Sequence, residues 1–311
     1  DTGIKLIDDI GGTGSGCRVL DMKEFVEYLH NKNIYVIGRV TVFQDPLYTK
    51  VKPEHAVKRK SDGGVWKDRK GISFIDVGAK ESWDYTLAIA KASHDIGFDE
   101  INFDYVRYPS DGDMKDIDFT HTGSSPAGES KREMLRQFFE YLDKNLADTK
   151  MVTSADIFGM TTTNTDDLGI GQVLENALLY FDYVGPMVYP SHYPDNFNGW
   201  PDPNKVPYGI IKFSMDTAVA RANTLRSEVV GRMYTQTASS TEKIKTSFYN
   251  ERLEKRLGSH QLRPWLQDFD YPVKYTPEMV RAQIQATYDA GLTSWMMWDP
   301  ANTYTRSAYL E

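Results

Sequence analysis

The sequence predicts an α/β fold, a (β/α)8 TIM barrel, on two observations. Six helix-then-strand units follow one another with no hairpin signal between consecutive strands, which indicates parallel strands joined by crossover helices. Polar residues also follow the strands in nearly every unit: Asp45, Asp104, Asp156, His192, Asp268 and Asp299. A barrel draws catalytic groups from many strand ends, whereas the alternative, an open doubly wound sheet, gathers them at one switch point.

The first two units are predicted from their capping and stop residues. Helix 21–33 begins at Asp21, a suitable N-cap with a glutamate three residues later, and leads into strand 34–43. Helix 80–98 ends at a glycine and leads into strand 100–109, which a proline stops. The same alternation continues to the end of the chain, as helices 131–147, 171–181 and 277–291 and strands 150–159, 182–190, 262–270 and 293–300.

Only six strands can be counted, whereas closure of the barrel needs eight. We therefore expect the barrel to lack its first two strands in this chain. A length of 311 residues suffices for one large domain. We assign residues 1–311 to a single barrel domain and expect an insertion or lid at 235–261.

Composition excludes several classes of function. With 36 Lys and Arg against 44 Asp and Glu, the formal charge is −8, which disfavours binding to nucleic acid or to an anionic membrane. No apolar run is long enough for a membrane span. A single cysteine, Cys17, excludes an intramolecular disulfide. We expect a monomer.

Two aspartates are the candidate catalytic residues. Alternation along strand 100–109 places Asn102 and Asp104 on the inward face, and strand 150–159 presents Ser154 and Asp156 in the same way. Two carboxylates on neighbouring strands suit acid/base chemistry, which needs one ionised and one protonated group. Two alternatives stay open, because Asp104 could form a structural pair with Arg107 and Asp156 could anchor a substrate hydroxyl.

Further residues at the strand ends are candidates for substrate contact. The 6 tryptophans and 19 tyrosines of the chain suggest rings that stack on sugars, although aromatic residues also fill cores. The preferred platforms are Trp66, Trp200 and Trp265. The full set of expected substrate contacts is Tyr105, Arg107, Tyr189, His192, Trp265, Gln267, Asp268, Trp298 and Asp299.

The sequence motifs of several other enzyme classes are absent. Neither a Gly-x-Ser-x-Gly elbow nor a P-loop is present, and the glycine-rich segment 11–16 has no strand before it. The six histidines are scattered, so neither a metal nor a cofactor is expected.

Five segments together resemble a known family: FDEINFDYVRYPSDG, VTSADIFGMTT, DYVGPMVYPSHY, RPWLQDFD and WMMWDPANTY. They are similar to the bacterial putative glycoside hydrolase domain, a TIM barrel distantly similar to amylase-type and chitinase-type hydrolases. The resemblance implies that residues 100–109 form the fourth barrel strand, which in related hydrolases carries the nucleophile or a key acid, and this suits Asp104. Two departures are a longer segment at 235–261 and Asp299 in place of an expected asparagine.

The resulting hypothesis is a glycosidase that cleaves a polysaccharide or oligosaccharide with Asp104 and Asp156. The carboxylates would lie about 5 Å apart in a retaining enzyme and roughly 6.5–9.5 Å apart in an inverting one. The first rival is a non-catalytic carbohydrate-binding barrel at the cell surface, since every candidate acid is an aspartate. The second is a deacetylase, which the scattered histidines disfavour. The carbohydrate hypothesis favours a secreted bacterial protein, extracellular or at the cell surface.

Overall fold

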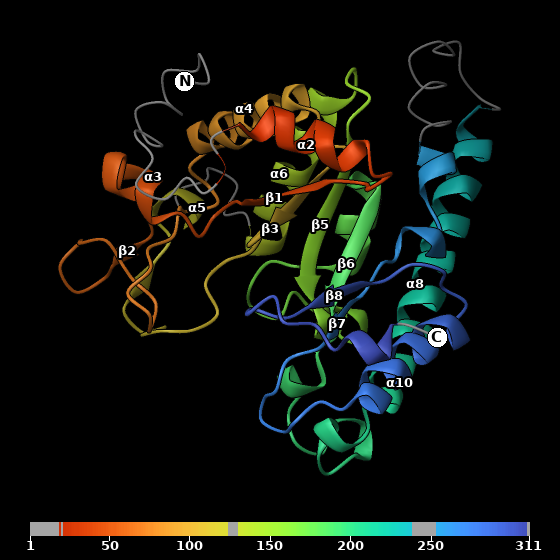
Figure 1. The fold of residues 1–311 in the computed structure, drawn as a ribbon. Coiled ribbons are helices and arrows are strands. Elements are labelled where there is room, and N and C mark those ends of the chain that lie inside the picture. The colour runs from red at the N-terminus through yellow and green to blue at the C-terminus, as the bar shows by residue number, and fades with distance from the viewer. Residues whose placement is uncertain (1–18, 20, 124–129, 238–252, 310–311) are drawn as a thin grey trace. The chain divides into compact units, whose positions relative to one another are not determined.

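The computed structural model describes residues 19, 21–123, 130–237 and 253–309 (Figure 1). The chain forms two compact units. Unit 1 comprises Asp1–Asp156 and Asp167–Gln172, and unit 2 comprises Ile157–Asp166 and Val173–Glu311. Residues 1–18, which include the glycine-rich segment 11–16, and residues 238–252, most of the expected insertion, lie outside the described part of the chain.

Unit 1 is built on three parallel strands, β1 (Ile37–Thr41), β3 (Glu100–Asp104) and β5 (Val152–Phe158), the last of which runs into unit 2. β3 pairs with β1 on one side and with β5 on the other. In the register of these pairs, Asn102 lies level with Arg39 on β1 and with Ser154 on β5. Three helices alternate with the strands, α2 (Met22–His30), α4 (Glu81–Ile96) and α6 (Lys131–Leu146).

The two faces of this sheet differ in chemistry because side chains alternate along each strand. Ile101 and Phe103 are fully buried on one face. Asn102 and Asp104 lie on the other. α4 packs on β1 and β3 and also contacts α2 and α6. α4 ends at Gly97, whose φ of 117° lies in the left-handed region where only glycine is unstrained.

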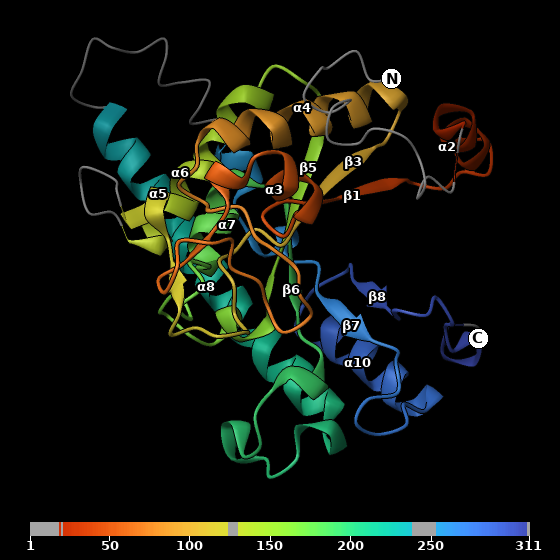
Figure 2. The same cartoon turned by 90° about the vertical axis from the view of Figure 1, so that its left-hand side faces the viewer.

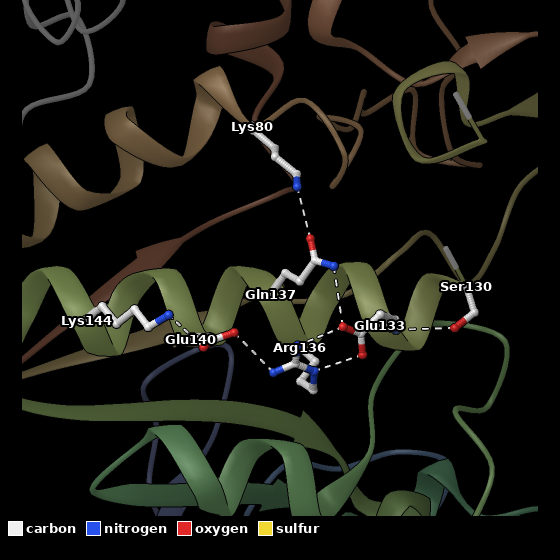
Figure 3. A network of polar contacts seen from close by, with 7 residues as sticks. All are labelled: Lys80, Ser130, Glu133, Arg136, Gln137, Glu140 and Lys144. Carbon is white, nitrogen blue, oxygen red and sulfur yellow. Dashed lines mark hydrogen bonds and ion pairs between the residues drawn. The ribbon is translucent and has the colours of Figure 1, made fainter. Parts of the chain in front are cut away.

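A network of polar contacts runs along α6 (Figure 3). Ser130 caps the helix by accepting from the backbone N–H of Glu133. Arg136 donates to both oxygens of Glu133, over 2.8 and 2.7 Å, and to Glu140 over 3.2 Å. Lys80, just before α4, donates to Gln137 over 3.0 Å and so links the two helices.

A lobe of unit 1 is inserted after β1 and β3. It contains α3 (Pro46–Val51), the short antiparallel pair of β2 (Lys58–Arg59) with β4 (Ile117–Asp118), and α5 (Thr120–Gly123). Trp66, expected to be a sugar platform, is instead 1% exposed in the core of this lobe with Val57, Phe74 and Ile117. Its indole N–H donates to the carbonyl of Asp113 over 3.0 Å, so both its ring and its polar atom are used inside the fold.

Unit 2 contains the parallel strands β6 (Tyr183–Met187), β7 (Trp265–Gln267) and β8 (Met296–Trp298). Its helices are α7 (Leu174–Tyr180), α8 (Pro207–Thr237) and α10 (Pro277–Asp289). α10 packs on β7 and along α8 (Figure 2). Ile210, Ile211 and Met215 of α8 are fully buried.

The predicted fold class is confirmed. In the described part of the chain, six parallel strands and their crossover helices follow the predicted order, and six is two fewer than a complete (β/α)8 barrel needs. The predicted extension of the second strand to Pro109 was wrong, because Tyr105 adopts a φ of 53° and turns the chain directly after Asp104. Helix α8 was not predicted. None of the helices within the described ranges has the length and apolarity to cross a membrane.

Candidate active site

The polar face of the sheet in unit 1 forms the candidate active site. Paired residues of parallel strands present their side chains to the same face, so one row of side chains crosses all three strands. Its members are Arg39, Glu100, Asn102, Asp104, Ser154 and Asp156. The five residues from β3 and β5 are each at most 5% exposed. Burial of polar groups is costly without hydrogen bonds, so the partners within this row decide what it can do.

Asp104 is held by the neighbouring strand. Its Oδ2 forms an ion pair with Nη2 of Arg39, and its Oδ1 accepts the backbone N–H of Tyr105 over 2.6 Å. Desolvation lowers the pKa of Arg39, but the negative charge of Asp104, and then that of Asp156, outweighs it and raises the pKa overall. Arg39 therefore faces two carboxylates, and Asp104 has the partners that stabilise an ionised carboxylate.

Arg39 was missed in the sequence, where Arg107 was considered as the structural partner of Asp104. A signal was present, because Arg39 alternates with Val40 on the predicted strand 34–43 and is the only charged residue in that apolar run.

Arg107 and Tyr105 follow Asp104 in the chain and interact with each other. The guanidinium of Arg107 lies 5.2 Å from the ring centre of Tyr105 and 6.0 Å from that of Phe74. Arg107 donates to the carbonyl of Tyr108 over 3.0 Å and to Ser110 Oγ over 3.1 Å. Burial lowers the pKa of Arg107, against the opposing effect of Tyr105 and Asp104. Both side chains are half-buried, and their contact with a substrate stays a prediction.

Asp156 is held by a neutral amide. Nδ2 of Asn102 donates over 3.0 Å both to Oδ1 of Asp156 and to Oγ of Ser154. Ser154 in turn donates to Oε1 of Glu100 over 2.5 Å, and Tyr35 donates to Oε2 of the same glutamate over 3.2 Å. Asp104 is the last residue of β3, whereas Asp156 lies within the adjacent strand β5, and the two predicted catalytic aspartates accept from chemically different groups.

The polar residues at the strand ends of unit 2 form hydrogen bonds mainly with the loops of the same unit. Oε1 of Gln267 accepts from Ser191 N and Oγ over 3.2 and 2.9 Å. Its Nε2 donates to the carbonyls of Phe269 and Tyr271 over 3.1 and 2.9 Å. Because Gln267 is fully buried and all of these contacts are internal, its position fixes the loops after β6 and β7.

Rings cluster around these loops. Trp265 and Trp298 are half-buried and meet edge to face with their centres 5.9 Å apart. Tyr189, which is 6% exposed, lies 5.2 Å from the ring of His192 and 5.7 Å from that of Phe269. His192 itself is exposed, and desolvation by these neighbours lowers its pKa. Trp200 is half-buried and packs against Phe213.

The two candidate aspartates of unit 2, Asp268 and Asp299, accept hydrogen bonds from the segment that follows β8. Oδ2 of Asp268 accepts from Thr305 N over 2.7 Å and from the Tyr309 hydroxyl over 2.5 Å. Oδ1 of Asp299 accepts from Ala301 N over 2.6 Å. Desolvation and then the bond to Asp268 raise the pKa of Tyr309, so its hydroxyl stays protonated and able to donate. Both aspartates are buried, at 4% and 6% exposed.

Within the described ranges, no three histidine, cysteine or acidic residues lie close enough together to form a metal-binding group. The chain matches the model of the family described as "Putative glycosyl hydrolase domain" over residues 9–253 and 232–304. It belongs to this family. The family description agrees with the resemblance that the strand-end motifs show. The matched residues span both units.

Two solved structures of glycoside hydrolases share the fold. The glycoside hydrolase domain of PgaB (BpsB) from Bordetella bronchiseptica matches with a TM-score of 0.55 and 13% identity, over 90% of this chain and 75% of that one. A chitinase from Chromobacterium violaceum ATCC 12472 matches with a TM-score of 0.51 and 10% identity, over 95% and 84%. A hypothetical protein from Ruminiclostridium thermocellum ATCC 27405 is 33% identical over 55% of this chain and 76% of that one, with a TM-score of 0.43. No curated protein matches the chain.

Proposed function

We propose that this member of the family is a glycosidase that cleaves a polysaccharide or oligosaccharide with Asp104 and Asp156. The family description and the fold shared with glycoside hydrolases support a general glycosidase role. The observation that carries the assignment of residues is the difference between two neighbouring carboxylates. Asp104 pairs with the cation Arg39, whereas Asp156 accepts from the neutral amide of Asn102.

This difference suggests a role for each aspartate. We assign the role of nucleophile or general base to Asp104, which forms an ion pair with Arg39. We assign the role of general acid to Asp156, the neighbouring buried carboxyl, which accepts from the amide of Asn102. In the proposed reaction Asp156 gives its proton to the glycosidic oxygen. Asp104 either attacks the anomeric carbon or deprotonates the water that does so.

The remaining candidates are proposed as substrate contacts. Tyr105 and Arg107 lie nearest to Asp104 in the chain and are half-buried. In unit 2, Trp265, Trp298 and His192 offer exposed ring surface for stacking. Tyr189, Gln267, Asp268 and Asp299 are buried and would act mainly by shaping the loops that carry these rings. We also propose that the protein works outside the cell, as a monomer.

The test combines a substrate screen with two substitutions. The protein is incubated with a panel of oligosaccharides and aryl glycosides, and product release is followed. Asp104→Asn and Asp156→Asn should each lower kcat/KM on the best substrate at least about 100-fold, the scale of a lost acid, base or nucleophile. The melting temperature reports whether folding is preserved.

Asp143→Asn is the matched control. Asp143 is a buried aspartate on α6, 7% exposed, and has no part in the proposed chemistry. It should keep the wild-type kcat per folded molecule. Wild-type turnover by Asp104→Asn would overturn the proposal. Glycan binding without product release would instead favour the carbohydrate-binding barrel.

A further inference from the structure

A continuous row of hydrogen bonds leads from Glu100 to Asp156 across β3 and β5. It passes through Ser154 and Asn102, and all four residues are at most 2% exposed. Neither Asn102 nor Ser154 was a candidate site residue in the sequence. The row lies on the same face of the sheet as Asp104.

The hydrogen atoms of this row can be assigned one by one. A serine hydroxyl has a single hydrogen, and Ser154 gives it to the carboxylate of Glu100. The lone pairs of Ser154 Oγ are then left to accept from Asn102 Nδ2. That nitrogen has two hydrogens, and the second is directed at Oδ1 of Asp156. The glutamate at the base of the row thus decides which end of the Asn102 amide faces Asp156.

The other end of the same amide supports this orientation. Oδ1 of Asn102 is buried and accepts no hydrogen bond from any described residue. An unsatisfied buried acceptor is costly, so the amide would be expected to rotate if rotation gave Oδ1 a hydrogen-bond donor. Rotation would instead place Oδ1 against the oxygens of Ser154 and Asp156, and both donated bonds would be lost. The row therefore holds the amide in the orientation that serves Asp156.

We propose that Asn102 is the positioning residue of Asp156, and that Glu100 and Ser154 fix the direction of its amide. The proposal rests on the proposed function, in which Asp156 is the general acid. The bond from the anomeric carbon to the glycosidic oxygen breaks, its electron pair stays on that oxygen, and the oxygen takes the proton of Asp156. The carboxylate left on Asp156 then accepts the Asn102 N–H more strongly than the neutral acid did.

The first test uses the dependence of rate on the leaving group. The substrates are the 2,4-dinitrophenyl and the phenyl glycosides of a sugar that the wild type hydrolyses. Dinitrophenolate leaves without protonation, whereas phenolate needs an acid. Asn102→Ala should lower kcat/KM about 10- to 100-fold on the phenyl glycoside and less than about 3-fold on the dinitrophenyl glycoside. Ser154→Ala should show the same pattern to a smaller extent.

Asn204→Ala is the matched control. Asn204 is also a buried asparagine, 8% exposed, and its amide donates to Asp202 within its own turn. It should change the rates on both glycosides equally or not at all. An equal loss on both glycosides in Asn102→Ala would overturn the positioning role, because a merely structural defect does not depend on the leaving group.

The second test needs no turnover. The titration of the Asp156 carboxyl is followed by carbon-13 NMR and assigned by its absence in Asp156→Asn. Asn102→Ala removes a donor to the ionised form, so the midpoint should rise by about one pH unit. An unchanged midpoint would overturn the proposal. If the wild type hydrolyses no glycoside, the proposed function fails, and the titration still decides whether Asn102 acts on Asp156.

Discussion

Aspartates at strand ends occur in both units of this protein, but their partners differ. In unit 1, Asp104 and Asp156 are held by side chains of neighbouring strands, Arg39 and Asn102. In unit 2, Asp268 and Asp299 are both held by the segment that follows β8. A carboxylate bound by rigid strands is held in a fixed position for chemistry, whereas one bound by a segment outside the sheet stabilises that segment. The same sequence pattern thus has two physical outcomes.

Arg39→Met should have the largest effect on activity, because it removes the positive charge that pairs with Asp104. The Arg39 side chain is 39% exposed but that of Asp104 only 7%, so loss of the cation leaves a buried carboxylate uncompensated. We expect kcat/KM to fall by about 100-fold or more. Initial rates across pH on the substrate found in the screen would measure this loss.

Arg39→Lys is the control for this comparison. It keeps the positive charge but not the planar guanidinium, so part of the activity should return. If Arg39→Met instead matched the wild type, the charge of Arg39 would have no role in the function of Asp104. The contrast between the two units would then reduce to a difference in burial.

Asp268→Ala should show the opposite balance, with a large loss of stability and little loss of rate. It removes the acceptor for Thr305 N and for the Tyr309 hydroxyl inside the fold. We expect the free energy of unfolding to fall by about 2–4 kcal/mol, and kcat per folded molecule to stay within about 3-fold. Chemical denaturation and active-site-normalised rates would test both parts.

Tyr309→Phe separates the contributions of the two hydrogen bonds that Asp268 accepts. It removes only one of the two donors and should cost about 1 kcal/mol. A large loss of kcat in Asp268→Ala at full stability would contradict the structural role and would return Asp268 to the substrate contacts.

The difference between the two units also explains what the sequence could predict. The alternation of helices and strands could be predicted from the sequence, because each helix–strand pair has its own capping residues and apolar run. The fold class followed from this alternation. Asp104 and Asp156 could be placed on one face because period-two alternation is a local property.

Partners from other strands could not be predicted in this way. The pairing of Asp104 with Arg39 joins residues 65 positions apart, and it depends on the register between β1 and β3. The short range of β3 was equally hidden, because Tyr105 turns the chain with a positive φ that tyrosine rarely adopts. Trp66 was misassigned because burial of a ring is decided by the packing of a distant segment, here the residues around Ile117.

Arg136→Ala should have the smallest effect and gives the scale for an exposed ion pair. Arg136 bonds to Glu133 and Glu140 along α6, in the network of Figure 3. Both glutamate side chains are about a third exposed or more, at 39% and 31%, so water and salt screen the interaction. We expect a loss of less than about 1 kcal/mol in the free energy of unfolding, and that loss should shrink in high salt. A cost equal to that of Asp268→Ala would mean that exposure does not determine the energetic value of the polar contacts of this protein, and the contrast between a buried carboxylate and a surface ion pair would fail with it.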